Sequence, residues 1–380
     1  MKLGRYELSA ELARGGMGII WLASARGIGG FRKPVVVKEL LPQHASDEHY
    51  RSMFLDEARL AARLSHKNIV QTLDLGEENG RLFMALELLE GATLRRVVTL
   101  LGKKRLRPAL AARIVCEVLA GLDYAHRLKD DDGGSLGIVH RDVTPANVFL
   151  CFDGQVKLID FGIARSRAHE VKTREGFVKG TAAYMSPDHV SPRPIDPRAD
   201  VFVAGILLRE LLLGERLWGE DADDASILRC LLIGHVPELP ERDDVPAELR
   251  AICIRAMAPS REDRFFTAEE MRVALEAWLV ENDSGGSLAE LARLFAGDLG
   301  FEVARVRMQH KQTAVEEEEP KLAEQPATAS PTAPALERRT PRAARFALVM
   351  AVVATIAASV SVASAVLDDD GREAVIEVEP

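Results

Sequence analysis

Residues 138–162 constrain the fold of this chain more than any other stretch. Two short apolar runs, 148–151 and 156–159, are separated by the dipeptide Asp153-Gly154, which is typical of a tight hairpin turn. The pattern predicts two antiparallel strands. Because the outer ends of such strands lie side by side, the side chains that flank this hairpin must meet at its open end.

The side chains that flank the hairpin are polar. Asp142 and Asn147 precede the first strand, and Asp160 follows the second. Two oxygen ligands beside a carboxylate base are what phosphoryl transfer requires, because Mg²⁺ neutralises the phosphates while the base orients the attacking hydroxyl. The sequence therefore predicts a site for metal-assisted phosphoryl transfer at the open end of the hairpin.

The spacing of these residues resembles the catalytic and metal loops of eukaryotic-type protein kinases, in their bacterial, Hanks-type serine/threonine form. A His-Arg-Asp tripeptide at 140–142 is followed by Asn147 and by Asp-Phe-Gly at 160–162. The resemblance implies an α+β, bilobal fold with a small antiparallel-sheet N-lobe and a mainly helical C-lobe. It implies ATP and Mg²⁺ as cofactors, Asp142 as the residue that orients the substrate hydroxyl, and Asn147 and Asp160 as the metal ligands.

The N-terminal segment resembles the glycine-rich loop of the same family. Residues 6–26 are predicted to form two strands around the sequence ARGGMG at 13–18, where glycine lets the backbone approach phosphates closely. The first glycine of the family pattern is Ala13 here, which we expect to be tolerated and to stiffen the loop. The residues expected to cover the nucleotide are Ala13, Arg14, Gly15, Gly16, Gly18 and Ile20.

Two charged residues complete the expected nucleotide site. Lys38 lies in the predicted strand 34–40, and Glu57 lies in the predicted helix 47–64. Taken alone, Lys38 is an ordinary solvated strand end and Glu57 an ordinary exposed helical acid. With the catalytic loop present, the resemblance implies that Lys38 and Glu57 form a catalytic pair that positions the α- and β-phosphates.

The order of the family's elements identifies a hinge after the strand predicted at 82–88. Leu86 would be the gatekeeper, and Glu87 and Leu89 would offer backbone bonds to adenine, although a plain core strand has the same composition. Helices are predicted at 93–101 and 108–128.

The loop that follows the hairpin, 163–179, holds two candidate phosphosites, Thr173 and Ser166. A phosphate on Thr173 would pair with Arg141 and order the loop. The next segment has Thr181, the family's mark of serine/threonine kinases.

Three further residues match family positions with structural roles. Asp188 stands where the family has glutamate, one methylene longer, and would pair with Arg264. Asp200 would brace the backbone of the catalytic loop.

Composition limits the partners and the compartment. The net charge of −9 argues against bulk nucleic-acid binding, so the expected partners are ATP and protein substrates. The four cysteines are far apart in apolar segments and form no C-x-x-C pair, which predicts buried free thiols rather than zinc ligands or a disulfide framework. The N-terminus has no apolar signal-peptide core, so the amino-terminal part is expected to be cytoplasmic.

The composition changes after the kinase-like region. A short amphipathic stretch at 287–295 either packs on the C-lobe or has no structural role, and the segment that follows is too polar to bury a core. The expected organisation is a kinase domain (6–282), a short helical extension (283–312), a disordered juxtamembrane linker (313–345), a transmembrane helix (346–367) and an extracytoplasmic tail (368–380).

The predicted transmembrane helix has 22 residues without a charge. As a helix, this segment would be about 33 Å long, enough for a hydrocarbon layer of about 30 Å. Arginines precede it and aspartates follow it, so the kinase region would face the cytoplasm from a single-pass inner-membrane anchor. The alternative is a buried C-terminal helix. Small residues recur every fourth position from Ala347 to Ala363, either as a homodimer interface or by chance in a segment rich in alanine and serine.

These features predict a membrane-associated signalling kinase that phosphorylates protein serine and threonine hydroxyls and autophosphorylates its activation loop. The alternative is a pseudokinase scaffold that binds nucleotide or partners without turnover. Thr144 keeps that alternative open, because it stands where these kinases usually have a lysine that contacts the γ-phosphate.

Overall fold

The computed structural model describes residues 1–102, 105–161, 182–219, 221–282 and 287–292. The chain divides into two units, Met1–Glu319 and Pro320–Pro380, and every described residue belongs to the first. The predicted linker, transmembrane helix and tail (313–380) lie outside the described residues. Within the described ranges, no helix is long and apolar enough to cross a bilayer.

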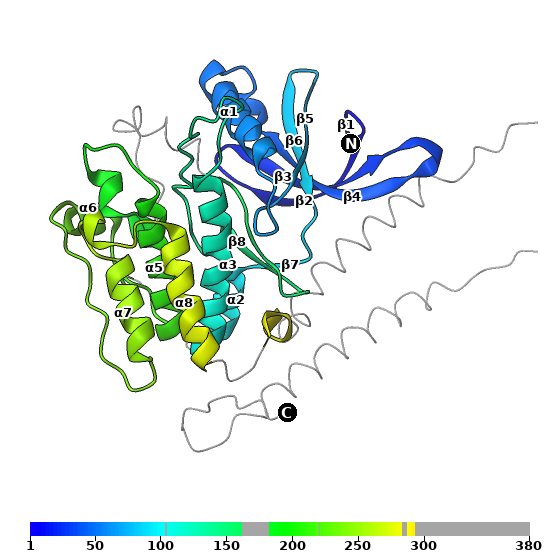
Figure 1. Ribbon diagram of the computed structural model, residues 1–380. Coiled ribbons are helices and arrows are strands. Elements are labelled where there is room, and N and C mark those ends of the chain that lie inside the picture. The colour runs from blue at the N-terminus through cyan, green and yellow to red at the C-terminus, as the bar shows by residue number, and fades with distance from the viewer. Residues whose placement is uncertain (103–104, 162–181, 220, 283–286, 293–380) are drawn as a thin grey trace, which may run out of the picture. The chain divides into compact units, whose positions relative to one another are not determined.

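The N-terminal lobe is an antiparallel sheet with one long helix beside it (Figure 1). Its strands are ordered β1-β2-β3-β4-β6-β5. The bounds are β1 (Lys2–Leu3), β2 (Tyr6–Arg14), β3 (Gly18–Arg26), β4 (Arg32–Leu40), α1 (Glu48–Arg63), β5 (Thr72–Glu78) and β6 (Arg81–Glu87). These elements confirm the strands and the helix predicted for this part of the chain.

The two faces of the sheet carry separate apolar clusters. Along β6, Leu82 and Met84 pack with Phe54 of α1, whereas Phe83 and Ala85 join the cluster on the opposite face. Successive side chains of a strand point to opposite faces, so a continuous apolar strand fills both layers.

Helix α1 begins directly after an N-cap residue, Asp47. The Asp47 carboxylate accepts hydrogen bonds from the backbone amides of His49 and Tyr50, and Glu48 places a second negative charge in the first turn. Glu57 lies on the buried side of this helix, together with Phe54 and Ala58, and 7% of its surface is exposed.

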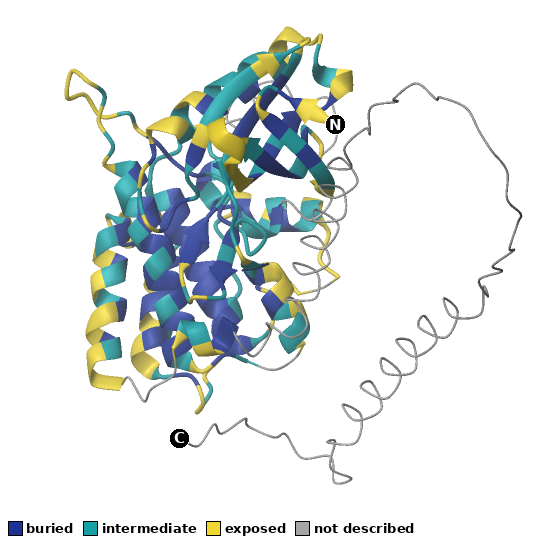
Figure 2. Cartoon of the chain, turned by 90° about the vertical axis from the view of Figure 1, so that its right-hand side faces the viewer, coloured by how far each residue is buried: buried dark blue, intermediate teal, exposed yellow. Residues whose placement is uncertain are grey.

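The C-terminal lobe is mainly helical, as predicted, and its buried residues concentrate inside the helical layer (Figure 2). A second, three-stranded antiparallel sheet consists of β7 (Gly91–Thr93), β8 (Val148–Cys151) and β9 (Val156–Leu158). The helices are α2 (Leu94–Leu101), α3 (Pro108–His126), α5 (Arg198–Leu213), α6 (Asp224–Leu232), α7 (Ala247–Ala256) and α8 (Ala268–Asn282). Short 3₁₀ turns lie at Ile28–Gly30, Pro42–His44, Ala182–Tyr184, Pro187–Val190 and Arg261–Asp263. The bilobal α+β fold is therefore confirmed.

Helix α5 is the centre of the helical lobe. Apolar residues face outward all round it, and they are almost completely buried against α3, α7 and α8. A helix that is apolar on every side is stable in a soluble domain only where other elements cover all of its faces. This position makes α5 a rigid support for what is attached to its first turn.

Three of the four cysteines are buried free thiols, as predicted. Burial raises the pKa of Cys116 and of Cys253 to about 12, and that of Cys151 to about 11, so these side chains stay protonated at neutral pH. Cys230 is free but only half-buried, so the predicted burial is wrong for this residue, which lies off the buried face of α6 that Ile227 and Leu231 form.

The described part of the extension packs on the C-lobe. Residues 288–292 form a helical turn, and the Ser287 hydroxyl and the Glu290 carboxylate each accept a hydrogen bond from the other residue's amide. Leu291 and Ala292 are buried in the C-lobe core. Of the two alternatives left open by the sequence, packing on the C-lobe is the one observed.

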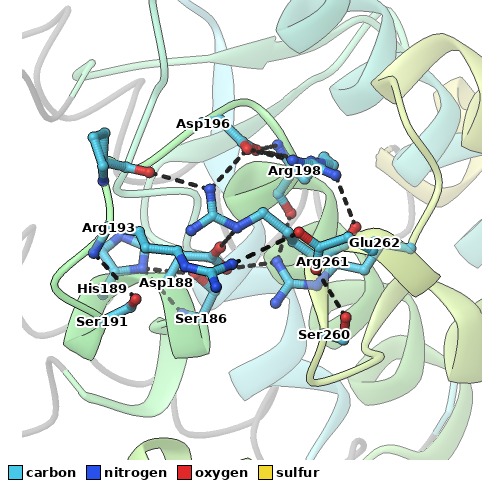
Figure 3. Close-up of polar contacts among 12 residues, drawn as sticks. Ser186, Asp188, His189, Ser191, Arg193, Asp196, Arg198, Ser260, Arg261 and Glu262 are labelled. Carbon is cyan, nitrogen blue, oxygen red and sulfur yellow. Dashed lines mark hydrogen bonds and ion pairs between the residues drawn. The ribbon is translucent and has the colours of Figure 1, made fainter.

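Ion pairs join the segment 186–198 to the segment 260–264 (Figure 3). The Asp188 carboxylate lies 2.6 Å from Arg264 Nη1, which confirms the predicted pair, and its other oxygen lies 3.1 Å from Arg261 Nε. The second arginine was not predicted. It satisfies the oxygen that a shorter acid would otherwise leave without a partner.

A neighbouring carboxylate, Asp196, ties the same two segments together. It accepts hydrogen bonds from Arg198 and from Arg261 Nη1. Burial raises the pKa of Asp196, but the hydrogen bonds from the two arginines outweigh burial and lower this pKa to about 2. Arg261 therefore bridges Asp188 and Asp196.

We expect Arg264→Ala to lower the free energy of unfolding by about 3 kcal/mol, because it leaves a nearly buried Asp188 with one arginine. Urea unfolding followed by circular dichroism measures this change. Arg193→Ala is the matched control, since Arg193 and Glu262 are exposed and 3.8 Å apart, and it should change the free energy by less than about 0.5 kcal/mol. Equal effects of the two substitutions would contradict the role of the buried pair.

Candidate active site

The β8–β9 hairpin brings the predicted metal ligands together. Val148 pairs with Leu158, and the amide of Ile159 donates a hydrogen bond to the carbonyl of Asn147 at 2.9 Å. Asp160 is the next residue. The predicted convergence of Asn147 and Asp160 at the open end is therefore confirmed.

The side chain of Asn147 is oriented by the predicted catalytic aspartate. Its Nδ2 donates hydrogen bonds to the backbone carbonyl and to the carboxylate of Asp142, both at 2.9 Å. Because the amide nitrogen faces Asp142, the amide oxygen points to the other side, where a cation would require an oxygen ligand.

A buried ammonium joins the two lobes. Lys38 Nζ on β4 lies 2.6 Å from Glu57 Oε1 on α1 and 2.9 Å from Asp160 Oδ1 after β9. Burial lowers the pKa of Lys38, but the two carboxylates outweigh burial and raise this pKa above its ordinary value. The ammonium in turn lowers the pKa of Asp160. The Lys38–Glu57 pair is thus formed, and its role toward the phosphates stays a prediction.

The backbone of the catalytic loop is braced from α5. Asp200, in the first turn of α5, accepts hydrogen bonds from the amides of His140 (2.8 Å) and Arg141 (2.9 Å). It also accepts one from His126 Nε2 at 2.8 Å. Burial raises the pKa of Asp200, but the bonds from its donors outweigh burial and lower it, so the group stays ionised. The predicted brace is confirmed.

His126 was missed by the sequence analysis, which treated 108–128 as a plain apolar helix. It closes α3 and lies 74 positions before its partner, Asp200. The available signal was a polar residue on the otherwise apolar inward side of the helix.

Two residues of the site have left-handed backbone conformations that are uncommon outside glycine. Arg141 has φ 63° and Asp160 has φ 53°. Such conformations cost on the order of 1–3 kcal/mol and persist where the surroundings hold them. The hydrogen bonds that Asp200 accepts from the amides of His140 and Arg141 hold Arg141, and the ion pair with Lys38 holds Asp160.

Two rings from the catalytic and metal loops also contact each other at a tilt of 33°. The rings of His140 and Phe161 are 4.4 Å apart, and His140 Nδ1 accepts a bond from the amide of Asp142 at 3.3 Å. Burial lowers the pKa of His140, so this ring is neutral at neutral pH. The ring contact connects the catalytic loop with the metal loop.

The side chain of Glu87 fixes the predicted hinge to strand β9 and to the residue before strand β5. The Glu87 carboxylate lies 2.7 Å from Lys157 Nζ on β9 and accepts a bond from the amide of Gln71 at 2.9 Å. Lys157 was not predicted, although a charged residue inside the short apolar strand was its signal. Leu86 and Leu89 are half-buried. The gatekeeper role of Leu86 and the backbone bonds of Glu87 and Leu89 to adenine stay predictions.

The glycine-rich loop is the turn between β2 and β3. Ala13 pairs with Ile20 in extended strands, so the position of the missing glycine needs no glycine conformation. The Gly15 amide donates to the carbonyl of Gly18 at 2.9 Å and closes the turn. A Cβ on Gly18 would lie 2.8 Å from the carbonyl oxygen of Glu39, so this position requires glycine. Arg14 and Gly16 lie at the exposed end of the same turn.

The donor set fits Mg²⁺ bound with a nucleotide better than a metal held by protein alone. No group of three or more His, Cys, Asp or Glu side chains able to hold a metal occurs in the described ranges. Asn147 and Asp160 supply oxygen ligands, and Mg²⁺ commonly takes one or two protein ligands and completes its shell with phosphates and water. The predicted phosphosites Ser166 and Thr173, together with Thr181, lie outside the described residues.

Comparisons with known proteins agree with this geometry. A family model described as a protein kinase domain matches residues 6–274. The chain is 40% identical over 302 residues to the tyrosine-protein kinase MasK of Myxococcus xanthus. The aligned region covers 79% of this chain and 47% of MasK. It is 36% identical over 275 residues to the serine/threonine-protein kinase PknL of Mycobacterium tuberculosis, covering 72% and 65%. The chain thus spans less than two thirds of either relative.

A solved structure is similar over the same region. The PknI kinase domain of Mycobacterium tuberculosis superposes with a TM-score of 0.55 at 26% sequence identity, covering 73% of this chain and 97% of that domain. The similarity extends over both lobes described above.

We expect Asp200→Asn to lower kcat by about tenfold or more while the Kd for ATP changes less than about twofold. The amide offers one acceptor oxygen where the carboxylate accepts from His126 and two backbone amides, whereas Lys38 and Glu57 are untouched. Initial rates and calorimetric titration separate the two quantities. Asp131→Asn, in the exposed turn after α3, is the control, and a parental kcat in Asp200→Asn would refute the brace.

Proposed function

Since this chain belongs to the protein kinase family, we propose that it transfers the γ-phosphate of ATP to serine and threonine hydroxyls of proteins. The observation that carries the proposal is the shared ammonium of Lys38, which contacts Glu57 and Asp160 at once. This arrangement connects the nucleotide-binding strand, the helix α1 and the metal loop, and active kinases need all three in place.

Each residue of the site has a role in the proposed reaction. ATP supplies the phosphoryl group and leaves as ADP, and Asn147 and Asp160 would hold Mg²⁺, which would offset the charge of the phosphates. Lys38, held by Glu57, orients the α- and β-phosphates. Asp142 accepts the hydrogen bond of the incoming hydroxyl and takes its proton.

The choice of serine and threonine over tyrosine is the finer part of the proposal. Among the relatives, MasK is named a tyrosine-protein kinase and PknL a serine/threonine-protein kinase. Thr181 favours the second specificity, because it matches the family's mark for serine/threonine kinases. Phosphoamino acid analysis of a labelled protein substrate such as casein decides between them, and label on tyrosine alone would overturn this part.

A pseudokinase scaffold is the second candidate, and Thr144 is the observation that favours it. A threonine side chain supplies no cation to the γ-phosphate. Nevertheless, the predicted base Asp142 and the predicted metal ligands Asn147 and Asp160 are present and close together. This arrangement favours turnover.

We expect Asp142→Asn and Asp160→Asn to fail in different ways. Asp142→Asn removes the base and should lower transfer of labelled phosphate by about 100-fold or more, with ATP binding retained. Asp160→Asn removes a charged metal ligand and should raise the Kd of ATP about tenfold in the presence of Mg²⁺, with little change in its absence. Near-parental turnover in the first variant, or unchanged metal dependence in the second, would contradict these roles.

We further propose that residues 346–367 anchor the kinase to the inner membrane, with the kinase domain in the cytoplasm. The uncharged length and the arginines on the N-terminal side support this topology. Two anchored copies would meet at high local concentration, which favours phosphorylation of the loop around Thr173 in one copy by the other.

We expect replacement of the small residues Ala351, Thr355 and Ser359 by leucine to reduce both dimer crosslinking and Thr173 phosphorylation in membranes. Leucine fills the groove that small residues leave between helices while the segment stays apolar. Crosslinking yield and phosphopeptide mass spectrometry measure the two effects. Parental values for both would show that the recurrence of small residues at every fourth position reflects composition alone.

A further inference from the structure

The tip of the glycine-rich loop is held by a residue outside the site described above. His44 Nε2 lies 3.1 Å from the carbonyl oxygen of Gly16, and the amide of Leu41 donates to the carbonyl of Met17 at 2.9 Å. A carbonyl only accepts hydrogen bonds, so Nε2 of His44 is the protonated nitrogen of this ring. Both tip carbonyls are therefore turned toward the 41–44 segment.

The backbone amides of Gly16 and Met17, at the tip of the loop, are available to a ligand. Gly16 and Met17 donate their N–H groups to no described residue, and a Cβ at Gly16 would have no atom within 4 Å. The backbone thus offers two consecutive donors that no described residue uses. Consecutive free amides of this kind bind phosphate oxygens.

His44 is itself anchored to the N-lobe core. Its ring stacks on that of Tyr50 with centroids 3.8 Å apart and an interplanar angle of 21°. Tyr50 packs on the cluster that contains Leu40 and Phe54. Tyr50 and Glu57 are seven residues apart on α1, and therefore lie on one face of the helix.

We propose that His44 is a positioning residue that latches the tip of the glycine-rich loop to helix α1 and so presents the amides of Gly16 and Met17 to the nucleotide phosphates. The inference rests on the proposed nucleotide-dependent function. His44 acts through the loop backbone and touches no phosphate itself. The latch also connects the loop with the helix that carries Glu57, so both parts of the phosphate site share one support.

The His44 latch predicts which ligands bind more weakly when the contact is lost. A loop whose amides face the phosphates contributes to binding of ATP and ADP but not of adenosine. Loss of one exposed hydrogen bond of this kind should raise the Kd of ATP and ADP about three- to tenfold. A general loosening of the fold would instead weaken adenosine as well.

The experiment measures Kd by calorimetry for ATP, ADP and adenosine with the 1–380 chain in mild detergent and Mg²⁺. His44→Ala should weaken ATP and ADP and leave adenosine unchanged. His44→Gln should restore binding, because a glutamine amide can donate from nearly the same position. Tyr50→Phe should keep the stack and parental binding, whereas Tyr50→Leu should behave like His44→Ala. His235→Ala, exposed on the C-lobe, is the control.

The outcomes separate this inference from the proposed function. Parental ATP binding in His44→Ala, or equal losses for ATP and adenosine, would overturn the latch. A parent chain that binds ATP but transfers no phosphate would overturn the transfer proposal alone, since the binding comparison still tests the latch. A parent chain that binds no ATP would overturn both.

Discussion

The structure depends on one buried ammonium that is shared by two carboxylates. Removing such charges from water is costly, and close pairing is what offsets the cost. Lys38 comes from a sheet strand, Glu57 from the helix that follows it, and Asp160 from a hairpin in the other lobe. A shift of any of these elements leaves a buried charge with fewer partners. The ion pairs therefore couple the positions of the N-lobe sheet, α1 and the metal loop to each other.

A second constraint acts on the backbone of the catalytic loop. Arg141 in this loop has a positive φ value, as Asp160 in the metal loop does, and such values are unfavourable for residues with a Cβ. Asp200 compensates at Arg141 by accepting its amide together with that of His140. Because α5 is apolar on all sides and buried in the helical lobe, the position of this carboxylate is determined by packing. The core of the lobe thus sets the geometry of the loop.

Departures from the family pattern are compensated locally. Ala13 replaces a glycine in an extended strand position where glycine has no conformational advantage. Asp188 is shorter than the usual glutamate, and Arg261 provides its second oxygen with a partner in addition to Arg264. Thr144 differs from these, because no cation replaces the missing lysine among its described contacts.

The sequence by itself determined the elements and the chemical groups of the site. Periodicity and turn residues predicted the hairpin and α1, and motif spacing predicted that Lys38, Asn147 and Asp160 belong together. Only the tertiary structure decided which distant side chains support them. His126 meets Asp200 across 74 positions, and His44 meets the loop at Gly16 across 28. Local propensity and periodicity describe neighbours within a few residues, whereas such pairs arise from the packing of whole elements, which no local pattern encodes.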